Sequence, residues 1–350
     1  MRFSIAALFA IAALALTIPL PAQNGRAPLG FDAPGAATVS SPQCAPDCGT
    51  IAFANNAEGA IVGYYTDADV VPHAFLRAPN GHIVPFDAPG AGLGTKLDQG
   101  TVAYSINDWG LIAGQFQDSS YIFHGFVRYP DGSFSTFEVQ DAGTGAFQGT
   151  QAFDVNLEGT TAGIYVDGNN MQHGFVRSSY GEIKTFDPPG SLATMACEET
   201  CLNAEGAITG FFLDANNVFH GFIRDPEGKI TILDAPGAGK GADQGTFSGS
   251  INLEGTTTGY YADTNGALHG FVRNGDGHYT EFNVATTPKE RSQVLARFQS
   301  TCSAWSRENS STRLVQCMGF PGCLVGTSQH SMPKARVREP VRAPALRPTT

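Results

Sequence analysis

The sequence has little charge and contains no motif of a common enzyme class. Only 15% of its 350 residues are Asp, Glu, Lys or Arg, whereas about 25% is usual in a globular domain. The serine-hydrolase motif Gly-x-Ser-x-Gly, the zinc-protease motif His-Glu-x-x-His and the phosphate-binding P-loop are all absent. The sequence therefore gives no direct indication of catalysis.

Long hydrophobic runs and helical periodicity are also missing from most of the chain. Residues 1–22 combine Arg2 with an apolar run from Ile5 to Ile18, which predicts a secretory signal peptide cleaved near Ala22. After this segment no apolar run approaches the roughly 20 residues of a membrane helix, so no membrane span is expected. No segment keeps a helical period, and the 42 glycines favour an all-β protein.

Basic residues are scarce everywhere except near the C-terminus. Residues 1–285 contain 11 Lys or Arg and 29 Asp or Glu, whereas residues 286–350 contain 10 and 3. Binding of nucleic acid requires a basic surface that neutralises phosphates. The acidic region is therefore not expected to bind nucleic acid.

A five-residue motif recurs roughly every 49 residues through the acidic region. His-Gly-Phe-Val-Arg occurs at 124–128, 173–177 and 269–273, and close variants occur at 73–77 and 220–224. An Asn precedes each His by 17 residues, with Gly and Asp also in phase. The repeated positions are His73, His124, His173, His220 and His269, and Asn56, Asn107, Asn156, Asn203 and Asn252.

Each unit is predicted to contain four short β-strands. In the second unit the first strand ends at Asn107, the second covers 111–118, the third carries His124 and the fourth is a Phe-Asp type segment. Asn80-Gly81, Asp131-Gly132 and Asp276-Gly277 supply the positive φ that tight hairpins need. A four-stranded unit of this length is typical of a propeller blade. The predicted fold is an all-β, β-propeller-like array of four-stranded repeats, with a β-solenoid as the alternative.

The repeat domain is predicted to cover residues 30–285. Its five complete units are expected at about 37–91, 92–142, 143–190, 191–238 and 239–285. A Phe-Asp-Ala-Pro-Gly segment at 30–36 precedes them as a fourth strand without its first three. Because propellers commonly close by pairing strands from opposite ends of the chain, this orphan strand predicts a further unit after Phe282.

These motifs resemble a known family. His-Ala-Phe at 73–75, its four His-Gly-Phe relatives and the flanking Asn-x-x-Gly and Phe-Asp-Ala-Pro-Gly segments resemble the HAF family of probable extracellular repeats. The resemblance covers about residues 30–285. It implies a secreted bacterial repeat protein, and it implies no chemistry.

Four of the seven cysteines form two short pairs in the variable connectors, Cys44 with Cys48 and Cys197 with Cys201. In an exported protein such pairs predict local disulfides, and a shared zinc site is the alternative. The other three cysteines all lie in the basic tail. Without the tail the cysteine count is even.

The basic tail, residues 286–350, is interpreted as the product of a shifted reading frame. If the last base of each codon is joined to the first two of the next, codons 317–320 can encode His-Gly-Phe with its Gly fixed. The hidden His falls 49 positions after His269, and codons 300–301 can encode the preceding Asn. We predict that the intended protein has at least six units and that the tail is disordered. A genuine basic interaction tail is the alternative.

Residues repeated in every unit are expected to be structural, because a catalytic site needs unlike groups at one place. The five His are predicted to tie strands or blades together, with a metal-binding ring as the alternative. No cofactor is expected. The Asp eleven residues after each Asn is predicted to cap a turn, with calcium at 167–170 or 214–217 as the alternative. These residues are Asp67, Asp118, Asp167, Asp214 and Asp263.

Function is expected where the units differ. These places are Trp109, the loops after the repeated Asp, the connectors with Lys96, and the residue before a constant aromatic. That last position holds Tyr64, Gln115, Ile164, Phe211 and Tyr260, which suggests an exposed binding rim. The predicted function is an exported, non-catalytic scaffold for binding a glycan or protein ligand. A carbohydrate-active hydrolase or lyase is the alternative, and it would need carboxylates from different units to meet.

Overall fold

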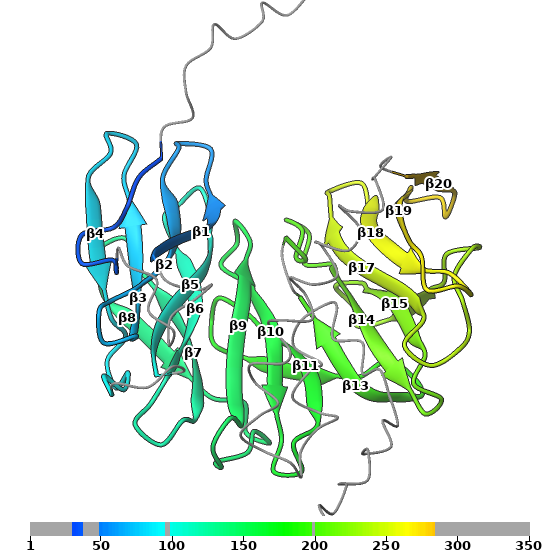
Figure 1. Cartoon of the computed structure of the whole chain (residues 1–350), viewed down its shortest axis with the longest axis horizontal. Coiled ribbons are helices and arrows are strands. Elements are labelled where there is room, and N and C mark those ends of the chain that lie inside the picture. Colours follow the sequence, from blue (N-terminus) through cyan, green and yellow to red (C-terminus); the bar gives the residue numbers. More distant parts are fainter. Residues whose placement is uncertain (1–29, 38–48, 95–98, 198–199, 284–350) are drawn as a thin grey trace, which may run out of the picture.

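A computed structural model of the chain describes residues 30–37, 49–94, 99–197 and 200–283 (Figure 1). These residues form twenty β-strands and no helix, which confirms the predicted all-β array of four-stranded repeats. No helix of the length and hydrophobicity that a membrane crossing requires occurs in this part of the chain. The predicted signal peptide, Cys44, Cys48, Lys96 and the basic tail lie outside the described residues.

The strands form five antiparallel groups of four, which we call blades 1 to 5. The first strands are β1 (Gly49–Asn55), β5 (Gly100–Ile106), β9 (Gly149–Val155), β13 (Ser191–Ala196) and β17 (Gly245–Ile251). The second strands are β2 (Ile61–Thr66), β6 (Ile112–Gln117), β10 (Thr161–Val166), β14 (Ile208–Asp214) and β18 (Thr257–Ala262). The third strands are β3 (Pro72–Arg77), β7 (Phe123–Arg128), β11 (Gln172–Arg177), β15 (Phe219–Arg224) and β19 (Leu268–Arg273). The fourth strands are β4 (Ile83–Phe86), β8 (Phe134–Phe137), β12 (Ile183–Phe186), β16 (Ile230–Leu233) and β20 (Tyr279–Phe282).

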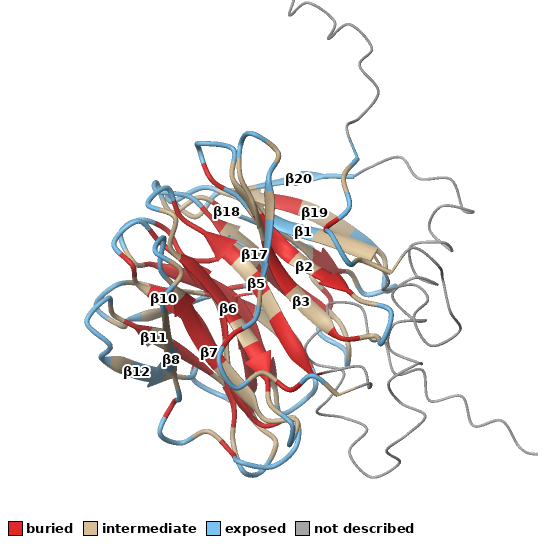
Figure 2. Cartoon of the chain, turned by 90° about the vertical axis from the view of Figure 1, so that its left-hand side faces the viewer, coloured by how far each residue is buried: buried red, intermediate tan, exposed pale blue. Residues whose placement is uncertain are grey.

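The blades follow one another around an arc that is open between blade 1 and blade 5 (Figure 1). Single parallel bridges join β7 to β9 and β15 to β17. Burial is greatest in the second strands, and the fourth strands, such as β12 and β20, lie exposed at the outside (Figure 2). Within the described residues, no blade follows blade 5.

Three tight turns connect the strands of each blade, and all use one geometry. In blade 1 the amide of Gly59 bonds to the carbonyl of Asn56, and the amide of Gly81 bonds to that of Ala78. Both glycines have positive φ, which for Gly81 was predicted from the Asn80-Gly81 dipeptide. The turn after the second strand has the same form, and its positive φ falls on Val70, Tyr121, Asn170, Asn217 and Gly266.

The Phe and Arg of the repeated motif pack adjacent blades together. Phe126 of blade 2 is fully buried, and the ring of Phe86 from blade 1 meets it edge-on at 6.5 Å. The Arg128 guanidinium lies 4.6 Å from the centre of the Phe86 ring, a favourable cation–π arrangement. The same contacts recur with Phe137 and Phe186 on the next blades. The fourth-strand Phe is therefore a contact between blades.

The segment at 30–37 lies on blade 1 as the end of a preceding blade would. Phe31 contacts Phe75 edge-on at 5.9 Å, and Arg77 lies over the Phe31 ring at 4.9 Å. The Ala33 amide donates to Thr50 Oγ1 at 2.8 Å. Equivalent amide-to-threonine bonds join blades 1 and 2, 2 and 3, and 4 and 5. Residues 31–36 thus make the contacts of a fourth-strand segment whose first three strands are absent from the described residues.

Blade 4 departs from the common pattern in its first strand. Thr194 pairs with Phe212 as Thr150 pairs with Tyr165 in blade 3, but three more residues separate Thr194 from the following Asn. The Cys197–Cys201 disulfide lies within this longer segment. The local disulfide predicted for this pair is therefore confirmed.

Candidate functional site

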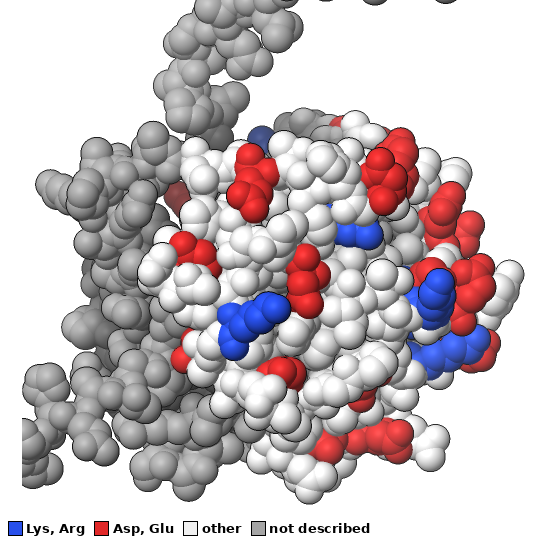
Figure 3. All heavy atoms as spheres, turned by 90° about the vertical axis from the view of Figure 1, so that its right-hand side faces the viewer, with Lys and Arg blue, Asp and Glu red and all other residues white. Residues whose placement is uncertain are grey.

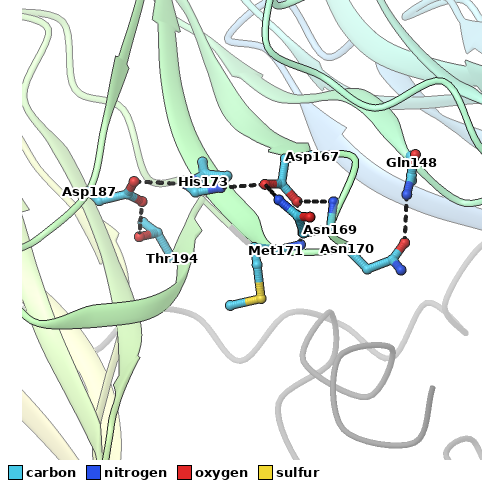
Figure 4. Close-up of polar contacts among 8 residues, drawn as sticks. All are labelled: Gln148, Asp167, Asn169, Asn170, Met171, His173, Asp187 and Thr194. Carbon is cyan, nitrogen blue, oxygen red and sulfur yellow. Dashed lines mark hydrogen bonds and ion pairs between the residues drawn. The ribbon is translucent and has the colours of Figure 1, made fainter. Parts of the chain in front are cut away.

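Each repeated His lies between two polar side chains of its own blade (Figure 4). In blade 3, His173 Nδ1 lies 2.7 Å from Asp187 Oδ2, and Nε2 lies 3.7 Å from Asp167 Oδ2. The ring stacks on Tyr165 at 4.9 Å, which holds it across the sheet. Equivalent contacts surround His73, His124, His220 and His269. The five His thus join the third strand to the segment after the fourth strand within a blade.

The repeated Asp caps the turn that separates the second and third strands. Asp167 Oδ1 accepts hydrogen bonds from the amides of Asn169 and Met171, both at 2.8 Å. Asp67, Asp118, Asp214 and Asp263 form the same pair of bonds. Among the described residues no group of three or more His, Cys, Asp or Glu could hold a metal ion. The carboxylate oxygens of these loops are engaged with their own turns.

The repeated Asn forms a ladder that runs from blade to blade. Asn156 Oδ1 accepts the amides of Glu158 and Thr160, which caps the turn after the first strand. Its Nδ2 donates to the backbone carbonyl of Asn203 in the next blade at 3.1 Å. Asn56, Asn107 and Asn203 each make the same bond to the Asn that follows. One side chain therefore caps its own turn and binds the next blade.

The acids beside three of the histidines raise the histidine pKa. The hydrogen bond that His173 donates to Asp187 is the main cause for His173, and bonds to Asp87 and Glu138 act in the same way on His73 and His124. A pKa raised by folding gives stability that is complete below pH 6.5 and is lost as the pH rises through the raised value. We expect the free energy of unfolding to fall from pH 6.5 towards mildly alkaline pH for this reason.

Replacing Asp187 with Asn tests this dependence, because the amide oxygen can still accept a hydrogen bond from His173 but carries no charge. In the Asp187→Asn variant we expect the pKa of His173 to fall, as followed by its NMR titration. The pH dependence of unfolding above 6.5 should become shallower. A His173 titration identical to that of the unmodified chain would contradict this account.

The variable position before the constant aromatic faces the first strands and does not form an exposed rim throughout. Ile164 and Phe211 are buried, although exposure was expected from the sequence. Tyr64 lies against Phe53 at 5.7 Å, and Gln115 Nε2 donates to the Tyr104 hydroxyl. Tyr260 stacks on Phe247 at 4.7 Å. These side chains vary because they pack on different neighbours.

Five exposed aromatic or aliphatic side chains lie on turns at one edge of the array. We call this edge the Asn rim, because it carries the turns after the first and third strands, such as 56–60 and 78–82. Trp109 is 72% exposed and Tyr180 is 99% exposed. Leu157, Leu253 and Tyr129 are also exposed on these turns.

A cavity of about 170 Å³ opens between blades 3 and 4, on the residues of the same rim. Ser178, Glu182 and Lys184 line it from blade 3, and Glu205, Arg224 and Pro226 line it from blade 4. No single unit supplies this wall. Alignment of the five units shows one difference at this cavity. Lys184 of blade 3 occupies the position that holds Val84, Ser135, Thr231 and Thr280 in the other blades.

The charges of this cavity are incompletely paired. Lys184 Nζ lies 3.6 Å from Glu182 Oε1, the only contact between a Lys or Arg and a carboxylate among the described residues. Arg224 is 6% exposed, and its Nε has no hydrogen-bond partner in this part of the chain. Burial lowers the pKa of its guanidinium. Its Nη1 donates to the Asp225 carbonyl at 3.0 Å, and the guanidinium lies over the Phe186 ring. Neither Arg224 nor Glu205 forms an ion pair among the described residues.

On the face shown in Figure 3, acidic side chains outnumber basic ones. Two acidic and two basic residues, Glu182, Glu205, Lys184 and Arg224, line the cavity between blades 3 and 4. This cavity is therefore the best candidate for a binding site in the described residues.

No known protein family and no curated protein matches the chain. Among solved structures, the BP39L lectin from Burkholderia pseudomallei has 10% identity and a TM-score of 0.42, covering 73% of this chain and 72% of that chain. A puromycin hydrolase mutant has 13% identity and a TM-score of 0.38, covering 68% and 46%. The six-bladed β-propeller lectin of Aleuria aurantia has 10% identity and a TM-score of 0.30, covering 68% and 96%. These similarities are too low to assign a ligand or an activity.

Proposed function

We propose that the chain is an exported, non-catalytic repeat scaffold that binds a glycan in the cavity between blades 3 and 4. The observation that supports this is the set of Lys184, Glu205 and Arg224 lining one cavity, of which only Lys184 forms an ion pair among the described residues. Sugar hydroxyls both donate and accept hydrogen bonds, so they match ammonium and guanidinium donors and a carboxylate acceptor.

The size and polarity of the cavity favour a small polar group over a peptide. Its volume of about 170 Å³ is below the roughly 300 to 1,000 Å³ of pockets that enclose drug-sized ligands. A cavity of this size holds a single ring of a longer chain, whose neighbouring rings would extend over the surface of the rim. Exposed aromatic side chains such as Trp109 and Tyr180 lie on that rim and offer flat apolar surface to sugar rings.

One observation favours the alternative of a hydrolase or lyase, because two carboxylates, Glu182 and Glu205, line the same cavity. A glycosidase needs one of its carboxyls to stay protonated near neutral pH, which burial usually provides. Both glutamates are exposed, and Glu182 is beside Lys184. The burial that such a general acid uses is therefore missing at both glutamates, so binding without cleavage is the better account.

Export is part of the proposal. It is supported by the signal-peptide pattern at 1–22 and by the HAF-like repeats. The Cys197–Cys201 disulfide agrees with it, because disulfides persist in oxidising compartments outside the cytosol.

The proposal is tested by applying the full chain to an immobilised array of neutral and acidic glycans. We expect saturable binding to a subset, with an affinity loss of about tenfold or more in Lys184→Ala and Glu205→Gln, because each removes a charged hydrogen-bond partner. Lys229→Ala is the matched control, since Lys229 does not line the cavity, and its affinity should be unchanged. Absence of binding, or equal binding by all three variants, would count against the site. Release of new reducing ends from a bound glycan would favour the hydrolase.

A further inference from the structure

The outer face of blade 5 carries the groups that join blades elsewhere, but no blade of the described residues faces it. Each of the four junctions uses the Asn side-chain donor, and three of them use a fourth-strand Phe. Asn252 and Phe282 hold these positions in blade 5. Phe282 is 50% exposed, whereas Phe86, Phe137 and Phe186 are only partly exposed.

The Asn ladder shows the same asymmetry. Asn56, Asn107, Asn156 and Asn203 are buried, with at most 7% of each residue exposed. Asn252 is exposed, although its Oδ1 still caps its own turn through the Thr256 amide at 2.9 Å. The blade 5 face therefore supplies one half of a blade junction, the Asn252 side chain and the Phe282 ring. The other half, a backbone carbonyl and an aromatic ring of a following blade, is not present in the described residues.

The segment at 31–36 decides which partner fits this face. On blade 1, Phe31 occupies the place beside Phe75 that the fourth-strand Phe of a preceding blade would take. Phe282 from a second copy of the chain could reach Phe75 only by displacing Phe31 and breaking the Ala33–Thr50 bond. Head-to-tail association of two copies is therefore blocked at blade 1, and the receiving blade must come from elsewhere.

We propose that the open face of blade 5 is the docking surface for a sixth unit of the same repeat, encoded in the shifted frame of codons from about 285 onward. In that frame codons 300–301 allow an Asn that falls 49 positions after Asn252, and codons 317–320 allow His-Gly-Phe at the spacing of the other units. The hidden Asn would supply the carbonyl for Asn252 Nδ2. The hidden Phe would supply the ring that Phe282 meets edge-on.

The experiment compares the full chain as printed with a full chain carrying the single-base change that restores this frame after codon 284. Backbone amide hydrogen exchange is followed for β19 and β20, together with the size of each protein in solution. We expect the β20 amides to exchange at least tenfold more slowly in the frame-restored chain, which should be monomeric. The chain as printed should keep fast exchange in β20.

Asn252→Asp in both chains separates docking from a general gain in stability, because the carboxylate keeps the turn cap and loses the donor to the next blade. We expect no change in the midpoint of thermal unfolding of the printed chain and a fall of several degrees in the frame-restored chain. Any of three results would overturn the proposal. The β20 amides could exchange equally fast in the two chains, the frame-restored chain could fail to fold, or Asn252→Asp could have the same effect in both chains. Protection of β20 through self-association of the printed chain would overturn it as well.

Discussion

Replacing Asn156 with Asp is expected to lower the free energy of unfolding by about 3 kcal/mol. The carboxylate keeps an oxygen for the Glu158 and Thr160 amides, so the turn cap survives. The lost group is the Nδ2 donor, which lies 3.1 Å from the Asn203 carbonyl of the next blade at a position that is 6% exposed. A buried carboxylate oxygen facing a carbonyl has no partner and is repelled. Urea unfolding at pH 7 measures the loss.

The matched control is Asn252→Asp, made in the chain as printed. Asn252 caps its turn in the same way through Thr256, but it is exposed and no described blade follows it. We expect a change within about 0.5 kcal/mol, as for most surface substitutions. A loss at position 252 equal to that at 156 would show that the substitution acts on the turn, and that the blade-to-blade bond contributes little.

The features that could be predicted from the sequence are those determined within one unit. The positive φ of Gly81 and Gly132, the four strands around His124 and the turn cap of Asp118 all depend on residues a few positions apart. Short-range turn chemistry and strand alternation determine such features. Recurrence in five units made each pattern stronger than it would be in a single copy.

The features that could not be predicted depend on contacts between units. The order in which blades face one another decides that Lys184 of blade 3 meets Glu205 and Arg224 of blade 4. The spacing of a repeat does not predict which positions of neighbouring units line the same cavity. The same reason explains why Ile164 and Phe211 were expected to be exposed and are buried, since their neighbours come from first strands in the adjoining blades.

The role of the repeated Asn could be predicted only in part from the sequence. The recurrence of Asn56 and its equivalents was visible in the sequence, but its cause was not. The side-chain oxygen acts within the unit, and the side-chain nitrogen acts on the next one. A residue with both a donor and an acceptor is required at this position, which accounts for the amide in every unit.

Asp154 is the only Asp or Glu among the described residues that is buried, and it joins three blades. Its Oδ1 accepts the Ser105 hydroxyl of blade 2 at 2.7 Å and the Val155 amide at 2.8 Å. Its Oδ2 accepts the Leu202 amide at 3.0 Å, beside the disulfide loop of blade 4. Burial raises the pKa of Asp154 against the effect of these hydrogen bonds. Because the folded pKa is raised, its contribution to stability falls as the pH rises through the interval between the unfolded and folded values.

Replacing Asp154 with Ala is expected to lower the free energy of unfolding at pH 7 by about 3 kcal/mol, even though a costly buried charge is removed. The substitution leaves the Ser105 hydroxyl and the Val155 and Leu202 amides without their acceptor in a buried position. Unpaired buried donors cost more than the pair contributes. Urea unfolding of Asp154→Ala is compared with Glu227→Ala, an exposed acid whose loss should change stability by less than about 0.5 kcal/mol. An Asp154→Ala chain as stable as the control would show that desolvation of the carboxylate cancels its three hydrogen bonds, and that other contacts such as the Asn ladder and the Phe pairs hold blades 2, 3 and 4 together.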